Sequence, residues 1–363
     1  MKNTFGNSVT VTLFGESHGD AVGVVIDGIA PGIEIDEDFI SSQLSLRRPK
    51  GAISTARKEA DKYKIVSGVF EGKSCGTPIC IIIPNEDTKS ADYSSTRSLA
   101  RPGHADYTAN CKYHGFEDWR GGGHFSGRLT APLVAAGAIA LSALSKKGIH
   151  IGTHIKKCAG VCDRDFADLN TDIKTLSTMD FAVLDKDSAD KMQTAILAAA
   201  EEGDSVGGVL ETAITGVPKG VGEPWFDSVE SQLSHMLFSI PAVKGVQFGL
   251  GFDFADKKGS EANDCFCMEN GKVTTKTNNN GGINGGITNG EPILFSCVVK
   301  PTPSIFKTQQ TVDFIKGEDA LISLKGRHDP AIVHRALVVV NSVSAIVLCD
   351  MLCARFGTDW LKG

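Results

Sequence analysis

The feature that most constrains this chain is a glycine-rich segment followed directly by a long apolar run. The segment reads Arg120-Gly121-Gly122-Gly123-His124-Phe125-Ser126-Gly127-Arg128, and the apolar run extends from Leu129 to Leu144. The run predicts a central helix over 130–147, rich enough in alanine and glycine to pack closely against a neighbour. Glycines let the loop approach a ligand, and the helix N-terminus adds N–H donors and partial positive charge. The pattern predicts an anion site, although a tight loop with solvated charges would also explain it.

The composition favours a small anionic ligand over a large polyanion. The chain has 363 residues, is 41% hydrophobic and 22% charged, and carries a net charge of −6. This charge gives no support to binding of nucleic acid or an anionic membrane surface. We expect no membrane span, since by this reading no run reaches the required ~18 apolar residues. Arginine, whose planar fork suits phosphate and carboxylate, is nevertheless concentrated in loops with glycine or proline: Arg47, Arg48, Arg57, Arg101, Arg120, Arg128 and Arg327.

The cysteines indicate a reduced compartment. There are 10 of them, but no C-x-x-C pair, which argues against a zinc site and against metal binding in general. Several stand in apolar surroundings, where a buried free thiol is the expected state. The N-terminal residues lack the apolar core of a signal peptide, so we expect a cytoplasmic protein.

Strands that come in pairs and helices that come separately predict an α+β fold. The absence of a linker further predicts one domain over residues 1–363. Expected strands cover 8–14, 22–26, 64–70, 79–83, 208–215 and 293–299. Besides the central helix, expected helices follow Asp36 as N-cap and cover 187–202, 227–238 and 331–356, the last interrupted by Asn341-Ser342.

Four further loop clusters combine histidine, arginine, hydroxyl or carboxylate groups at the ends of predicted elements. They are Gly15-Glu16-Ser17-His18-Gly19, Arg101-Pro102-Gly103-His104-Ala105-Asp106, Lys300-Pro301-Thr302-Pro303-Ser304 and Gly326-Arg327-His328-Asp329-Pro330. Taken singly, each has a structural explanation: an incidental histidine, Asp106 capping a helix, or a charged N-cap at Asp329. Together they indicate a site that binds a multiply charged anion and moves a proton. Motifs of Rossmann, Walker A and serine or zinc hydrolase sites are missing.

These clusters, with Arg47-Arg48-Pro49, Ser239-Ile240-Pro241-Ala242-Val243-Lys244-Gly245 and Gly281-Gly282-Ile283-Asn284-Gly285-Gly286, resemble the chorismate synthase family in order from about residue 5 to 355. The resemblance implies a β-α-β sandwich with antiparallel sheets around a helical layer, usually as a homotetramer. It implies 1,4-anti elimination of phosphate from 5-enolpyruvylshikimate 3-phosphate, giving chorismate in the shikimate pathway of aromatic amino acid biosynthesis. It also implies a requirement for reduced FMN without net redox change.

The resemblance assigns roles residue by residue. His18 resembles the proton donor to the leaving phosphate, His104 the one serving the reduced flavin, and Asp329 the residue that assists when the ring hydrogen leaves. Ser17 and Ser126 resemble supporting hydroxyls. The arginines that resemble substrate clamps are Arg47, Arg48, Arg57, Arg101 and Arg128. The positions that resemble flavin contacts are His124, Phe125, Ser126, Pro241, Ala242, Gly285, Lys300, Pro301, Thr302, Pro303, Ser304 and Arg327.

Two alternatives explain part of the same pattern. A non-catalytic protein that binds a phosphorylated metabolite would use the arginines and leave the histidines idle. A flavin oxidoreductase would turn over NADPH. The chain departs from many relatives at His124-Phe125, where they carry arginine and serine, and at Ala52-Ile53, near which they carry arginine. Because no appended domain is apparent, we expect an external flavin reductase to supply the reduced FMN.

Overall fold

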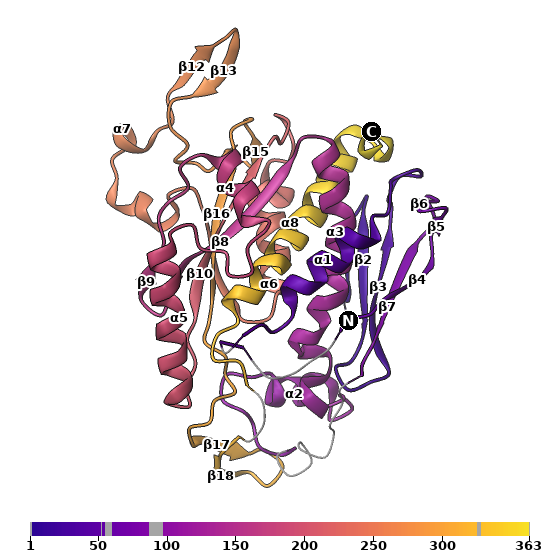
Figure 1. Cartoon of the computed structure of the whole chain (residues 1–363), viewed down its shortest axis with the longest axis vertical. Coiled ribbons are helices and arrows are strands. Elements are labelled where there is room, and N and C mark those ends of the chain that lie inside the picture. Colours follow the sequence, from indigo (N-terminus) through magenta and orange to yellow (C-terminus); the bar gives the residue numbers. More distant parts are fainter. Residues whose placement is uncertain (1, 52, 55–59, 87–96, 325–327, 363) are drawn as a thin grey trace.

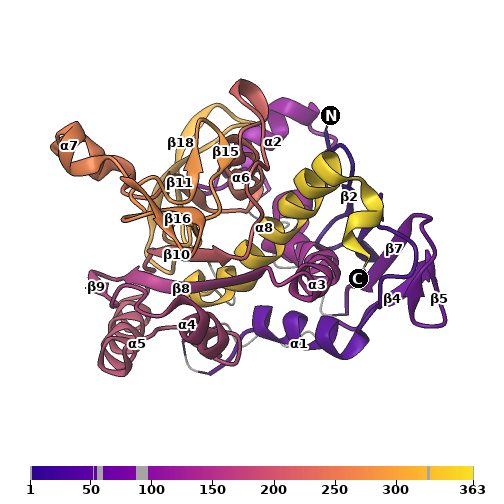
Figure 2. The ribbon, with the colours of Figure 1, turned by 90° about the horizontal axis from the view of Figure 1, so that it is seen from above.

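Two five-stranded antiparallel sheets enclose a layer of helices in the computed structural model, which describes residues 2–51, 53–54, 60–86, 97–324 and 328–362. Viewed from above, α3 (Thr130–Lys146) and α8 (Val333–Phe356) lie between the sheets (Figure 2). The predicted α+β class, with antiparallel sheets around a helical layer, is therefore confirmed.

The first sheet has the strand order β1-β2-β3-β7-β4. Its central strands β3 and β7 place valine and isoleucine at alternate positions toward the helices, as a half-buried strand does. The predicted strand 64–70 is broken at Gly68, where a Cβ would lie 2.6 Å from the carbonyl oxygen of Pro78. The bounds are β1 Thr4–Phe5, β2 Thr10–Gly15, β3 Ala21–Asp27, β4 Lys64–Ser67 and β7 Ile79–Pro84, with a hairpin of β5 Val69–Phe70 and β6 Lys73–Ser74.

The second sheet has the order β11-β16-β10-β8-β9. Two of its strands have the bounds that the sequence predicts, β10 (Gly208–Thr215) and β16 (Ile293–Val299), and they pair antiparallel along their length. The others are β8 His150–Cys158, β9 Val161–Cys162 and β11 Val243–Phe248.

The helix pair α3 and α8 forms the centre of the core. A Cβ built on Gly137 would lie only 2.2 Å from the Ser342 Cβ, so glycine allows this close crossing, as its sequence suggests. Helix α8 is continuous through Asn341-Ser342, where an interruption is predicted. Asn341 accepts a hydrogen bond from Thr153 Oγ1 at 2.6 Å, and the Ser342 hydroxyl donates to the Val338 carbonyl at 2.7 Å. Both polar side chains are thus satisfied inside the core.

Substituting Gly137→Ala is expected to destabilise the protein by about 1–3 kcal/mol, because the added methyl overpacks the helix crossing. Urea unfolding monitored by circular dichroism measures the change. Pairing it with Ser342→Gly should restore part of the loss, since that substitution removes the Cβ and Oγ of Ser342 and leaves its Cα, 2.5 Å from the added methyl, as the remaining close atom. If the double variant is no more stable than Gly137→Ala alone, the contact with the Ser342 side chain is not the source of the destabilisation.

Two helices have the length and hydropathy of membrane spans although they are mostly buried inside the protein. Gly127–Lys146 and Val333–Phe356 are long and apolar enough to cross a membrane, so the expectation that no run reaches this length is wrong. However, 78% and 89% of their most apolar windows are buried inside the protein. Their apolar character follows from their place between the two sheets.

The remaining helices surround this core. Helix α1 starts at the predicted cap Asp36, whose carboxylate accepts the Phe39 N–H at 2.8 Å. The bounds are α1 Glu37–Arg47, α2 Asp106–Tyr113, α4 Leu169–Leu176, α5 Lys186–Glu201, α6 Val229–Ser239 and α7 Gly259–Ala262. Short 3-10 segments are η2 Arg120–Phe125, η3 Gly127–Leu129, η4 Trp225–Asp227, η5 Gly251–Asp256 and η6 Thr358–Leu361.

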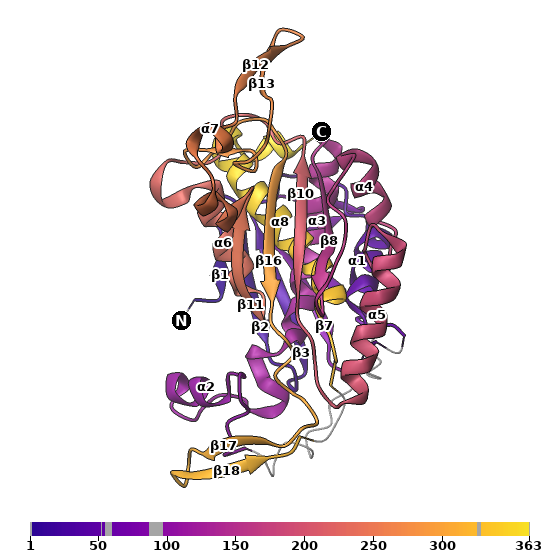
Figure 3. The same cartoon turned by 90° about the vertical axis from the view of Figure 1, so that its left-hand side faces the viewer.

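Hairpins project at the two ends of the molecule (Figures 1 and 3). One end carries β12–β13 and β14–β15, and the other carries β17–β18 beside α2. Their bounds are β12 Phe266–Glu269, β13 Lys272–Thr275, β14 Ile283–Asn284, β15 Ile287–Thr288, β17 Gln309–Asp313 and β18 Glu318–Ile322. Near the C-terminal end of the chain, Asp350 of α8 accepts the N–H groups of Asn7, Ser8 and Val9 at 2.6–3.1 Å.

Candidate active site

The glycine-rich loop runs between two histidines. Over Arg120–Phe125 its three glycines have positive φ angles of 57°, 89° and 51°, which side chains rarely adopt. A Cβ on Gly121 would lie 1.9 Å from Cε1 of His18, and one on Gly122 would lie 3.2 Å from Cε1 of His104. Glycine is therefore required for the loop to lie against both imidazoles. The two histidines, 86 positions apart in sequence, flank one stretch of backbone.

His18 is held in the turn between β2 and β3. The Ser17 hydroxyl lies 3.1 Å from Nδ1 of His18 and 3.3 Å from the carbonyl oxygens of Arg120 and Gly121. The Ser17 N–H donates to the Gly123 carbonyl at 3.1 Å. Both Ser17 and His18 are buried. The serine thus fixes the imidazole and ties its turn to the glycine loop.

The next three residues of the glycine loop are also engaged with the protein. Nδ1 of His124 lies 2.9 Å from the Gly15 carbonyl oxygen, which adds a second link to the His18 turn. The Phe125 ring meets the Tyr113 ring edge-on, with centroids 6.0 Å apart. Ser126 caps the short turn before α3 by accepting the backbone N–H two residues later at 3.3 Å. The predicted helix therefore starts after a capped 3-10 turn, at Thr130.

His104 shares a carboxylate with Arg101. Oδ1 of Asp106 lies 2.9 Å from Nδ1 of His104 and accepts Nη2 of Arg101 at 2.6 Å, while Oδ2 accepts the arginine Nε at 2.7 Å. Burial alone would raise the pKa of Asp106, but the hydrogen bonds from Arg101 and His104 lower it well below its usual range. Asp106 does not cap α2, whose N-cap is Ala105 without a side-chain hydrogen bond.

Two predicted substrate clamps, Arg47 and Arg128, converge on one buried carboxylate. Nη2 of Arg47 lies 2.7 Å from Oδ2 of Asp61, and Nη1 of Arg128 donates to its other oxygen. Burial would raise the pKa of Asp61, but the charges of both arginines lower it overall. Burial also lowers the pKa of Arg47. The three side chains form an internal ion cluster beneath the loops.

Arg128 connects this cluster to the His18 turn. Its Nε donates to Oδ1 of Asn85 at 2.9 Å, and its Nη2 donates to the Pro84 carbonyl at 3.0 Å. The Asn85 amide in turn donates to the carbonyls of Glu16 and Gly19 at 2.9 and 2.8 Å. This chain of contacts gives Arg128 a role in positioning the turn that carries His18.

Asp329 lies at the entry to α8 and is joined to the same cluster. Its carboxylate accepts Nη1 of Arg335 at 2.6 Å, and Nε of Arg335 donates to the Arg47 carbonyl at 2.8 Å. The residue does not cap α8, whose N-cap is Ile332 without a side-chain hydrogen bond.

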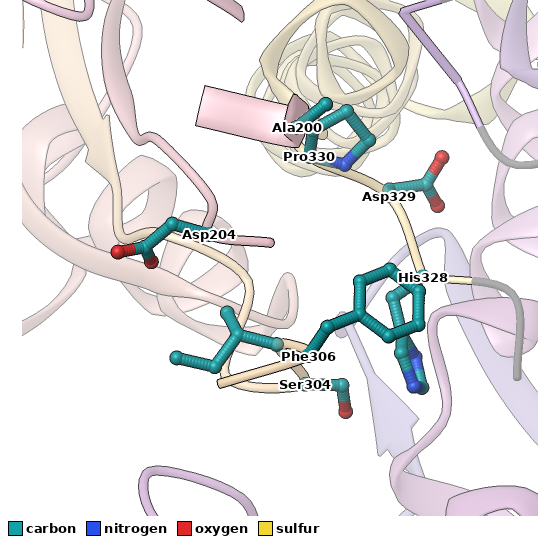
Figure 4. A pocket seen from close by; sticks show the side chains of 8 residues that line it. Ala200, Asp204, Ser304, Phe306, His328, Asp329 and Pro330 are labelled. Atoms are coloured by element: carbon teal, nitrogen blue, oxygen red, sulfur yellow. The ribbon is translucent and has the colours of Figure 1, made fainter. Parts of the chain in front are cut away.

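A small pocket of about 40 Å³ opens beside Asp329 (Figure 4). Its rim is formed by the Phe306 and His328 rings, whose centroids are 5.2 Å apart. Burial, followed by the charge of Arg101, lowers the pKa of His328, and its buried Nε2 has no hydrogen-bond partner among the described residues. The lining comprises Ala200, Asp204, Ser304, Ile305, Phe306, His328, Asp329 and Pro330.

Residues 300–304, which follow β16 and are predicted to contact the flavin, lie between Ala242, another predicted flavin contact, and the loop that carries His104. The Lys300 N–H donates to the Ala242 carbonyl at 3.0 Å, and its ammonium group donates to the Gly103 carbonyl beside His104. A Cβ on Gly103 would also lie 3.4 Å from the Pro303 Cβ. The Thr302 hydroxyl is buried and unpartnered among the described residues. The segment thus faces the His104 loop.

Not every predicted residue joins this cluster. Gly285 lies in the β14–β15 hairpin, toward the opposite end of the molecule from α2 (Figure 1). Arg48 is directed to the Ala60 carbonyl. Arg57 and Arg327 lie outside the described residues.

Sequence reasoning missed the supporting residues Asp61, Asn85 and Arg335. None stands inside one of the glycine or histidine clusters, and each contributes through a partner distant in sequence. Asp106 stands two positions after His104, and this short spacing was the sequence signal that could have predicted their side-chain contact. The structure brings two positioned imidazoles and several cations close to one glycine loop, a combination that suits acid–base chemistry on a small polyanion.

Comparisons with known proteins agree with this description. The family model described as Chorismate synthase matches residues 9–353. A chorismate synthase from Pyrococcus abyssi is 47% identical over 350 residues, covering 96% of this chain and 97% of the relative. The chorismate synthase of Lachnoclostridium phytofermentans is 47% identical over 364 residues, covering 99% and 98%. A crystal structure of chorismate synthase superposes with a TM-score of 0.75 at 27% identity, covering 97% of this chain and 94% of that one.

The matching family and relatives are lyases, so the chain is an enzyme of the carbon–oxygen lyase class. The chain belongs to the chorismate synthase family.

Proposed function

We propose that this protein converts 5-enolpyruvylshikimate 3-phosphate to chorismate and phosphate in the shikimate pathway, with reduced FMN as cofactor. In this 1,4-anti elimination, the C–O bond to phosphate breaks with its electron pair and a ring hydrogen leaves. The observation that carries the proposal is the pair of imidazoles, His18 and His104, held on either side of the glycine loop. Two positioned imidazoles, each able to donate or accept a proton, suit a reaction in which separate atoms need protons.

We assign each site residue a role in proton transfer, charge neutralisation or positioning. His18, fixed by Ser17, gives a proton to the departing phosphate, while His104 holds a proton toward the flavin and Asp329 assists loss of the ring hydrogen. Arg48, Arg57 and Arg101 neutralise the phosphate and carboxylates of the substrate. Arg47 and Arg128 set the electrostatic field of the site through Asp61. Ser126 supports the glycine loop as a cap.

The residues present fit FMN. The Thr302 hydroxyl and Nε2 of His328 are buried polar atoms without a described partner, and both lie in segments that border the pocket or the His104 loop. Reduced FMN would supply transient electron density to start phosphate departure. We propose that it is held by His124, Phe125, Ser126, Pro241, Ala242, Arg327 and the segment Lys300, Pro301, Thr302, Pro303 and Ser304.

Anaerobic mixing of the protein with reduced FMN and 5-enolpyruvylshikimate 3-phosphate tests the proposal. Stoichiometric release of chorismate and phosphate is expected. Binding without product would favour a non-catalytic protein for a phosphorylated metabolite. Oxidation of NADPH without elimination would favour a flavin oxidoreductase.

FMN and substrate together are expected to raise the melting temperature by several degrees. Ligands that bind only the folded state stabilise it by about 2.7 kcal/mol at 100 times their dissociation constant. Differential scanning fluorimetry with oxidised FMN and substrate, against riboflavin alone, measures the shift. An unchanged melting temperature at saturation would contradict the flavin site.

We further propose a cytoplasmic homotetramer that receives reduced FMN from an external reductase. The family resemblance supports the tetramer. Light scattering gives the oligomeric state. Turnover with NADPH as the sole reductant would show instead that the protein reduces its own flavin.

A further inference from the structure

The carboxylate of Asp106 sits where Arg101 and His104 meet. Oδ2 accepts the backbone N–H and Nε of Arg101 at 3.0 and 2.7 Å, so the arginine fork fixes the plane of the carboxylate. Oδ1 is then directed at Nδ1 of His104, 2.9 Å away. All three side chains are largely buried, with 13–19% of each exposed. The histidine therefore has a fixed partner on one ring nitrogen.

This arrangement determines which nitrogen of His104 carries a proton in the neutral ring. Asp106, paired with Arg101, stays ionised and can only accept hydrogen bonds. Nδ1 must therefore be the N–H that it receives. Nη2 of Arg101, 3.1 Å from the same Nδ1, cannot compete, because its short bond to Oδ1 at 2.6 Å is charge-assisted. The other nitrogen, Nε2, faces Gly122, where a Cβ would lie 3.4 Å from it.

We propose that Asp106 is a positioning residue that holds His104 in the Nδ1–H tautomer and leaves Nε2 as the atom that exchanges protons at the glycine loop. Through its second oxygen, the same carboxylate sets the orientation of Arg101, so one residue aligns the acid–base group and a cation. The catalytic part of this inference rests on the proposed function. Its structural part, the tautomer, does not.

The tautomer is tested by two-bond ¹H–¹⁵N correlation spectra of protein labelled with ¹⁵N-histidine. The His104 signals are assigned by their loss in His104→Gln. Wild-type protein is expected to show Nδ1 protonated and Nε2 unprotonated at high pH. In Asp106→Asn the side-chain amide can donate to Nδ1, so the signals should change to the Nε2–H pattern. A wild-type Nε2–H pattern, or an unchanged pattern in the variant, would overturn the proposal.

Kinetics test the catalytic part. Asp106→Asn is expected to lower kcat by about 10²-fold or more, the scale of a lost acid–base group, with a change in KM below tenfold. Asp106→Glu should recover part of kcat. The control is Asp172→Asn. It removes a similar carboxylate, Asp172 of α4, which accepts both terminal nitrogens of Arg164, and it should leave kcat within threefold.

A kcat of Asp106→Asn within threefold of wild type would overturn the positioning role. A fall in kcat that Asp106→Glu does not relieve, accompanied by an unaltered tautomer, would also overturn it. If wild-type protein shows no elimination at all, the proposed function fails, and the spectra still decide the tautomer.

Discussion

Alanine at His18 or His104 is expected to lower turnover by about 10²–10⁴-fold, the usual contribution of a positioned acid–base group. Substrate affinity should fall far less, because the anionic groups of the substrate are bound mainly by cations. The two histidines flank the glycine loop on separate elements, so each variant should show its own loss. Stopped-flow measurement of chorismate formation gives the rate, and isothermal titration gives the dissociation constant.

His150→Ala provides the control, because His150 lies exposed at the start of β8, outside the site. It should retain wild-type kinetics. If dissociation constants in the His18 and His104 variants rise as much as rates fall, both histidines are binding residues.

Asp61→Asn is expected to cost about 3–5 kcal/mol of folding free energy, because it leaves two buried arginines without their carboxylate. The same change should lower activity, since Arg128 positions the His18 turn through Asn85. Urea unfolding measures the stability. Asp180→Asn removes the exposed pair with Lys50 and should cost less than about 1 kcal/mol.

The pH dependence gives a second readout of Asp61. Its pKa is lowered in the folded protein, so its contribution is fully present above the unfolded value of about 3.9 and is lost as pH falls through the lower folded value. The stability difference between wild type and Asp61→Asn should therefore shrink in acid. A constant difference down to strongly acidic pH would contradict the ion cluster.

Arg128 shows where reasoning from the sequence needed the structure. Its place between the glycine loop and α3 predicts a substrate clamp whose replacement by lysine would spare stability. The structure shows that Arg128 also pairs with Asp61, Asn85 and Pro84, so its side chain has a structural role that the sequence does not predict. We therefore expect Arg128→Lys to lower stability as well as affinity. The partners lie 43 to 67 positions away in sequence, beyond the reach of local patterns.

Periodic segments were the most predictable part of the fold. Strands β10 and β16 and helix α3 follow from apolar patterns that depend only on neighbours in sequence. The continuity of α8 through Asn341-Ser342 did not follow, because the partner that satisfies Asn341 is Thr153 on another element. Loop motifs made His18, His104 and Asp329 candidates from the sequence alone, whereas the carboxylate Asp61 joins its two arginines only through segments that are distant in sequence.

The buried position of α8 has a consequence for how the chain folds. This helix lies between both sheets, and its Asp350 carboxylate accepts the N–H groups of the turn at residues 7–9, so the last α-helix along the chain is tied to the segment between the first two strands. Contacts of such large sequence separation slow folding, since long loops must close before they are stabilised. During synthesis, α3 can cover the first sheet early, whereas the apolar inner face of the second sheet has to wait for α8 and needs protection until nearly the whole chain has emerged.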